Sequence, residues 1–197
     1  MQTRMTSGWS LVAVAVCAIV LGRPVNSNAQ NVSGQARAVQ ATVGTLLGIT
    51  TSILADTGTL SGPTDSRHAS KLSGSIGSLL TAETLHATAI AWPDQVASEA
   101  SMAGLSLNVA GNTITAGFVQ ARITSVAGAA ATRASSIDGL AINGLAIDVS
   151  GDPNQTISIP GGSIVINEQN GSVVNALHII INGIADVVIA SASAAAQ

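Results

Sequence analysis

The sequence predicts a mainly β protein: a single-domain antiparallel β-sandwich that follows an N-terminal signal peptide, with a β-solenoid as the alternative architecture. Short runs of alternating apolar and polar residues recur in its second half, separated by Gly and Asn. Of the 197 residues, 47% are hydrophobic and only 9% are charged, which excludes a disordered chain. Only 2% are aromatic, so the core must consist of Val, Ile, Leu and Ala, which pack between closely spaced layers.

The first 29 residues have the parts of a Sec-type signal peptide. Arg4 supplies the positive start, and an apolar run follows from Leu11 to Leu21. Small residues stand at the −1 and −3 positions of a cut between Ala29 and Gln30, so we expect cleavage there. As a helix this run would rise about 16 Å, roughly half of a hydrocarbon core, so cleavage is favoured over the alternative of an uncleaved membrane anchor. We expect no stable membrane span after cleavage.

Residues 30–197 form the expected extracytoplasmic domain, secreted, at the cell surface or in the periplasm. They contain no basic run, and cleavage removes Arg4 and Arg23 from the chain. Both facts argue against nucleic-acid binding. The single cysteine, Cys17, lies in the signal peptide, so the mature domain has neither a disulfide framework nor a thiolate zinc site. A chain of this length can bury about 70% of its unfolded surface without such links.

The first half of the mature chain gives weaker signals. Ser33–Leu54 contains Thr, Val, Ile and interspersed glycines and is predicted as one or two strands. Thr57–Ser75 is rich in Gly, Ser, Thr and Pro and is predicted as an exposed loop. Leu79–Ala91 fits a strand or a short helix, although its threonines weaken the helix. The alanines of Ala127–Ala134 fit a helical turn.

The second half shows hairpins. Leu105–Phe118 consists of two alternating runs joined at Gly111-Asn112. Gly139–Ile147 repeats Gly-Leu-Ala-Ile after five residues, an odd spacing that requires a bulge or bend near Asn143. Ser163–Ala190 is predicted to form three antiparallel strands, with turns at its two Asn-Gly pairs.

Three segments near the C-terminus carry a family resemblance: Pro-Gly-Gly-Ser-Ile-Val-Ile-Asn-Glu-Gln at 160–169, Val-Asn-Ala-Leu-His-Ile at 174–179 and Ala-Asp-Val-Val-Ile-Ala-Ser-Ala at 185–192. With them the chain resembles the bacterial exported domains called choice-of-anchor P, over most of residues 30–197 and most sharply over 156–192. The resemblance implies a secreted or cell-surface β domain. It implies no activity and no catalytic residues.

Three residues form the candidate polar cluster. Glu168, His178 and Asp186 fall on or beside neighbouring strands of the predicted meander, where carboxylates would orient an imidazole. Alternation predicts that His178 shares its face with Ala176 and Ile180. The cluster fits either a functional histidine or, as favoured here, a structural hydrogen-bond group at the end of a sheet.

No catalytic, metal or cofactor site is predicted. His68, His86 and His178 lack any metal-binding spacing, and the chain has no G-x-S-x-G elbow and no phosphate loop. Asp148–Asn154 places oxygen side chains at alternate positions, as calcium loops do. Pro153 stands where an EF-hand requires Gly, so an acidic turn is the favoured interpretation.

We expect a non-enzymatic secreted or cell-surface domain with a structural, adhesive or interaction role. The alternative is a secreted hydrolase that acts on an envelope or extracellular polymer, which would need paired carboxylates in a cleft. The runs 179–181 and 187–189 are apolar on both faces, which implies cover on both sides. We therefore expect self-association or a cell-surface partner, with Val32–Val43 available to pair with the edge of a neighbour, unless Leu79–Ala91 or an Ala-rich helix provides the cover.

Overall fold

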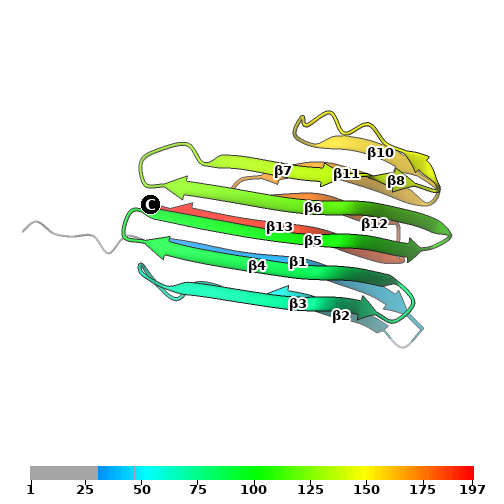
Figure 1. Ribbon diagram of the computed structural model, residues 1–197, viewed down its shortest axis with the longest axis horizontal. Coiled ribbons are helices and arrows are strands. Elements are labelled where there is room, and N and C mark those ends of the chain that lie inside the picture. Colours follow the sequence, from blue (N-terminus) through cyan, green and yellow to red (C-terminus); the bar gives the residue numbers. More distant parts are fainter. Residues whose placement is uncertain (1–30, 47) are drawn as a thin grey trace, which may run out of the picture.

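The computed structural model describes residues 31–46 and 48–197, so the expected signal peptide and its cleavage point lie outside the described residues. Within the described part the chain forms strands and no helices. The strands build two antiparallel sheets that lie face to face (Figure 1). This architecture confirms the β-sandwich and not the solenoid. The described residues include no helix that is long and apolar enough to cross a membrane.

Sheet A has six strands in the order β10-β11-β12-β13-β1-β2. Their bounds are β1 Val32–Thr45, β2 Gly48–Asp56, β10 Gln155–Ile159, β11 Gly162–Asn170, β12 Val173–Ile181 and β13 Ala185–Ala196. The N-terminal strand pairs with the C-terminal one, with Val32 opposite Ala196. Because β1 lies between β13 and β2, it is paired on both sides within its own chain. The expectation that Val32–Val43 is free to pair with a neighbour is therefore wrong.

Sheet B has seven strands in the order β3-β4-β5-β6-β8-β9, and β7 also pairs with β6. Their bounds are β3 Ser66–Ile76, β4 Leu80–Trp92, β5 Gln95–Val109, β6 Asn112–Val126, β7 Thr132–Asp138, β8 Ala141–Ile142 and β9 Leu145–Ala146.

Three parts of the chain differ from the sequence-based expectation. The second half of the predicted loop 57–75 is strand β3, which lacks a clear apolar alternation because it lies at the edge of its sheet. The segment 79–91 is strand β4 for nearly its whole length, so it is not a helix. The Ala-rich segment 127–134 is the β6–β7 turn and the start of β7. Gly128, with a φ of 73°, bends the chain there.

The predicted hairpins are present. The β5–β6 turn consists of Ala110 and Gly111, both at positive φ, so it lies one residue earlier than expected and Asn112 begins β6. Asn143 and Gly144, at φ 52° and 79°, form the expected bend between β8 and β9. The three strands β11, β12 and β13 form the predicted antiparallel meander.

A line of β-bulges crosses sheet A. Five neighbouring strands each hold one residue that has no cross-strand partner, all at the same level of the sheet: Asn167, Ala176, Ala190, Ala38 and Ala55. Each of these residues is buried, and all but Ala55 lie beside another buried residue, as Ala38 does beside Val39. Ala55 follows Leu54, which is partly buried against the core. The extra residue reverses the alternation of side chains along the strand. If odd-numbered residues point into the core before it, even-numbered residues do so after it, and the reverse.

Sheet B also has a line of β-bulges across neighbouring strands. Here the extra residue of each strand points outward, to solvent. Thr84 and Gly104, at φ 45° and 57°, interrupt the register of β4 with β5. On β6, Gly117 and Phe118 are consecutive and both exposed, where β5 skips Gly104. In both sheets, therefore, the alternation of inward and outward side chains reverses within the strands, and the reversals lie at matching levels on neighbouring strands.

The core is one hydrophobic cluster between the sheets, and alanines make up much of it. Strands β13 and β1 lie over β5 and β4, and their Cα atoms approach within 8 Å across the interface. Stacked sheets usually lie about 10 Å apart. The close spacing agrees with the prediction of small core residues. Trp92 and Phe118 are 42% and 36% exposed and lie outside this core.

Candidate functional site

The centre of the candidate site is His178 on β12, with a carboxylate beside each ring nitrogen. Nδ1 lies 3.0 Å from Glu168 Oε2 on β11, and Nε2 lies 3.2 Å from Asp186 Oδ1 on β13. Asn175 Nδ2 donates to the same Glu168 oxygen at 2.6 Å. The structure thus brings together the three residues that the sequence singled out, and adds Asn175 to them.

The bulge line places these side chains on one face. Asn175 and His178 are three residues apart, a spacing that puts side chains on opposite faces of a regular strand. The extra residue Ala176 turns into the core, so both project from the outer face of sheet A. The expectation that Ala176 shares a face with His178 is therefore wrong, while Ile180 does lie on the outer face, half-buried. No local motif marks this bulge, so alternation alone could not have located Asn175.

The arrangement occupies both nitrogens of the ring. Each ring nitrogen has a carboxylate oxygen within hydrogen-bond distance, Glu168 Oε2 at Nδ1 and Asp186 Oδ1 at Nε2. A general base must instead offer a free nitrogen within hydrogen-bond reach of a substrate. The side chain of His178 is only 16% exposed. The geometry therefore fits cross-linking of three strands better than proton transfer.

A second polar group lies at the same level on β1 and β2, and sequence reasoning missed it. Arg37 Nε is 3.1 Å from Asp56 Oδ2, and Gln35 Nε2 donates to Asp56 Oδ1 at 2.8 Å. The amide of Gly58 donates to the same oxygen. Arg37 also bonds Gln40 on its own strand. Only the register of the β1–β2 hairpin, with Arg37 opposite Asp56, reveals this group.

The environment of Asp56 favours its ionised form. Burial acts to raise the pKa of this carboxyl. The hydrogen bonds from Gln35 and Gly58 and the charge of Arg37 together outweigh burial, so the pKa lies below its ordinary value. The group therefore stabilises the fold while Asp56 is ionised.

A third carboxylate, Asp65, anchors the loop between β2 and β3. Its Oδ2 accepts hydrogen bonds from the amide and hydroxyl of Ser61, both at 2.8 Å, and from Arg67 Nε at 2.9 Å. The hydrogen bonds from Ser61 and then those from Arg67 lower the pKa of Asp65. The side-chain interactions of this partly exposed residue lie within residues 61–67, and its backbone oxygen accepts a hydrogen bond from the amide of Ala91 on β4.

The remaining predicted candidates do not assemble. His68 and His86 are exposed on β3 and β4 of sheet B, whereas His178 belongs to sheet A. In the acidic loop before β10, Gln155 Oε1 accepts hydrogen bonds from Ser150, and the amide of Asp152 donates to the Ser150 hydroxyl. Among residues 31–46 and 48–197 no group of three or more His, Cys, Asp or Glu side chains could hold a metal ion.

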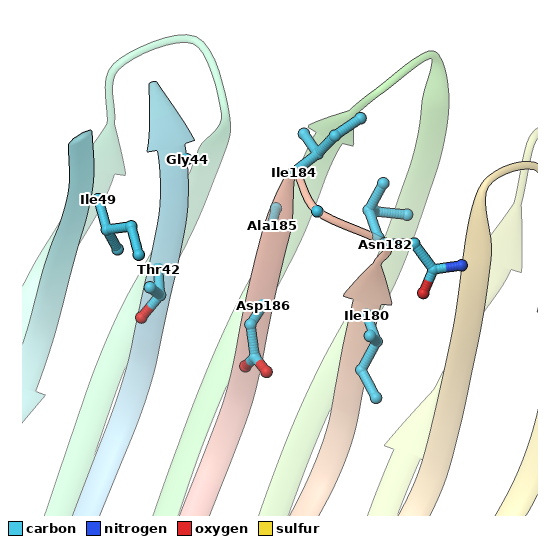
Figure 2. A pocket seen from close by; sticks show the side chains of 10 residues that line it. Thr42, Gly44, Ile49, Ile180, Asn182, Ile184, Ala185 and Asp186 are labelled. Atoms are coloured by element: carbon cyan, nitrogen blue, oxygen red, sulfur yellow. The ribbon is translucent and has the colours of Figure 1, made fainter. Parts of the chain in front are cut away.

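A shallow hollow of about 350 Å³ lies beside the His178 cluster, on the outer face of sheet A. Figure 2 shows Ile49, Ile180 and Ile184 around it, from β2, β12 and the β12–β13 turn, with Asp186 at its side. Asp186 is thus shared between the hollow and the cluster. The hollow is mainly apolar and suits a hydrophobic contact better than a polar substrate.

Comparisons with known proteins leave the fold and the site to be interpreted on their own. No protein-family model matches the chain, and neither the curated proteins nor the solved structures contain a match.

Proposed function

We propose that the protein is an exported, non-enzymatic β-sandwich domain with a structural, adhesive or interaction role outside the cytoplasm. One observation carries the proposal: the His178 cluster, the candidate that most resembles catalytic machinery, has both ring nitrogens bound to carboxylates. A hydrolase would need one of them for a substrate or a water molecule.

The outer face of sheet A supports an interaction role. Val165, Ile180 and Val188 project from this face and are only half-buried. The segment 79–91, one of the two alternative covers considered for these strands, belongs to sheet B, and the other, the Ala-rich segment 127–134, forms no helix. Within the described residues no other layer packs on this face. Apolar residues left uncovered on a sheet are typical of a binding surface.

Export rests on the sequence of residues 1–29 and agrees with the arrangement of strands. The first strand begins at Val32, so cleavage between Ala29 and Gln30 would remove no strand of the described fold. The resemblance to choice-of-anchor P domains supports the same location, secreted or at the cell surface.

The experiment combines location, binding and turnover. The full chain is expressed in a bacterial host, and we expect the mature protein outside the cytoplasm with Gln30 at its N-terminus. Binding to cell envelopes should fall at least tenfold in V188K, which alters the outer face of sheet A, and stay unchanged in A97K, which alters that of sheet B. A turnover of polysaccharides, peptides or esters that H178A abolishes, while the variant stays folded, would overturn the proposal.

A further inference from the structure

The four edges of the sandwich differ in how well they are protected against pairing with another strand. In sheet A, strand β10 has five residues and is flanked by Pro153 and Pro160. At one side of sheet B, β9 has two residues, and β7, which pairs with β6 at that side, carries Arg133. Strand β3 carries Arg67 and Lys71. Short strands, prolines and positive charges are the usual means of blocking an edge.

The edge of β2 has none of these protections. Between Gly48 and Leu54 the strand contains no charged residue and no proline, and its sequence is Gly-Ile-Thr-Thr-Ser-Ile-Leu. On the outer face Ile49 is 79% exposed and Ile53 is 44% exposed. In the described residues β1 is the sole partner of β2 in its sheet.

The register shows which backbone groups point to the open side. The amide of Gly44 donates to Ile184 O at 2.8 Å, on the β13 side, so its neighbour Thr45 directs its backbone groups toward β2. Thr45 lies opposite Gly48, and backbone direction alternates along a strand. Gly48, Thr50 and Ser52 therefore bond to β1, while Ile49, Thr51 and Ile53 direct their N–H and C=O groups to the open edge.

We infer that the protein forms a two-fold dimer in which the β2 edges of two copies pair antiparallel, with Thr51 on the axis. This register places Ile49 opposite Ile53 of the second copy, and Thr51 opposite Thr51 of the second copy. The three residues with open backbone groups then face open residues of the second copy, Ile49 with Ile53 and Thr51 with Thr51, which gives about six N–H···O bonds.

The side chains are self-complementary in the same register. Two Ile–Ile pairs lie on either side of a Thr–Thr pair, and cross-strand pairs of β-branched residues stabilise antiparallel sheets. A shift by one residue would place outward side chains opposite inward ones, so the register is defined. The dimer joins two copies of sheet A into one sheet and covers the most exposed part of Ile49.

The inference concerns only the assembly of the folded chain and is independent of the role proposed above, apart from the export and cleavage that yield the sample. Its test uses the mature protein obtained by export of the full chain, analysed by light scattering over a hundredfold concentration range. We expect the wild type to have twice the chain mass. I49K should be a monomer with native far-UV circular dichroism, because it sets charges in both Ile–Ile pairs. L72K, at an exposed position on the edge strand of sheet B, should remain a dimer.

A cysteine at position 51 tests the register. Residues opposite each other in a hydrogen-bonded antiparallel pair have Cα atoms about 5.5 Å apart, within the range of a disulfide. Since the mature chain has no cysteine, oxidised T51C should form a covalent dimer in high yield, whereas T113C, on the outer face of sheet B, should not. A wild-type monomer throughout the range overturns the inference, even if β2 then accepts a strand from a different protein. So does a dimer that persists in I49K, or equal cross-linking of T51C and T113C.

Discussion

Asn175 and His178 lie three residues apart on β12 and contact the same oxygen of Glu168. The bulge at Ala176 makes this contact geometrically feasible, because it brings both side chains to the outer face of sheet A. The cluster thus joins β11, β12 and β13 through side chains at the level where the backbone ladder is interrupted.

The cluster should contribute to stability and not to turnover. H178A and E168Q should each lower the free energy of unfolding by about 1–2 kcal/mol, because they leave a partly buried polar group without its partner. D186N should have a smaller effect, since the side chain of Asp186 is 54% exposed. Urea unfolding at pH 7 measures these differences. An effect of D186N larger than that of E168Q would contradict the proposed order.

The Arg37–Asp56 ion pair should make stability depend on acid pH. The pKa of Asp56 is lowered in the folded state, so its contribution is complete above the pKa of the unfolded chain, about 3.9, and is lost as pH falls through the lower folded value. D56N should therefore cost about 1 kcal/mol at pH 7 and progressively less below pH 4. The measurement is the difference in unfolding free energy between the two proteins as a function of pH. A difference that grows on acidification would show that the sign is wrong.

The close approach of the two sheets should forbid a side chain at Gly34. A Cβ atom there would lie 2.6 Å from Val96 Cγ1 and 3.0 Å from Ser98 Oγ, on the facing strand β5. We expect G34A to lower stability by about 1–3 kcal/mol, since a packed core accommodates an added methyl group poorly. G62A is the matched control, because nothing lies within 4 Å of its new atom. Thermal unfolding of both variants tests the prediction, and equal melting temperatures would refute it.

Ser98 should be dispensable for stability. Its hydroxyl is buried in the interface between the sheets and has no hydrogen-bond partner among residues 31–46 and 48–197. Removal of an unsatisfied buried hydroxyl recovers its desolvation cost, so S98A should raise stability by up to about 1 kcal/mol. Denaturant titration of S98A beside the wild type is the measurement. A loss above 1 kcal/mol would mean that the hydroxyl has a partner in solution.

Much of the fold could be predicted from the sequence, where alternation and Asn-Gly turns act over short distances. The meander of β11, β12 and β13 is an example. The edge strand β3 was missed because its exposed position leaves little apolar alternation. The pairing of β1 with β13 joins the first described strand to the last, and no local pattern encodes such a contact.

The candidate site was predicted in part, for a related reason. Glu168, His178 and Asp186 could be grouped because they belong to consecutive strands of one meander. Asn175 was missed since its position depends on the bulge at Ala176. Bulges at alanine carry no residue signature, and they become visible only in the cross-strand register.

The alanine-lined interface has a consequence for how this protein obtains its stability. Because alanine side chains are short, the core between the two sheets is thin, and the protein cannot gain much buried area from the depth of this core. It gains that area from length: β5 and β6 have 15 residues each and β1 has 14, where strands of globular proteins usually have about five or six. Each added residue pair extends the same shallow core by a similar amount. Truncation at the strand ends should therefore lower the stability of the domain in small, nearly equal steps. Replacement of one central core alanine by a larger residue should instead push the two sheets apart along much of their length.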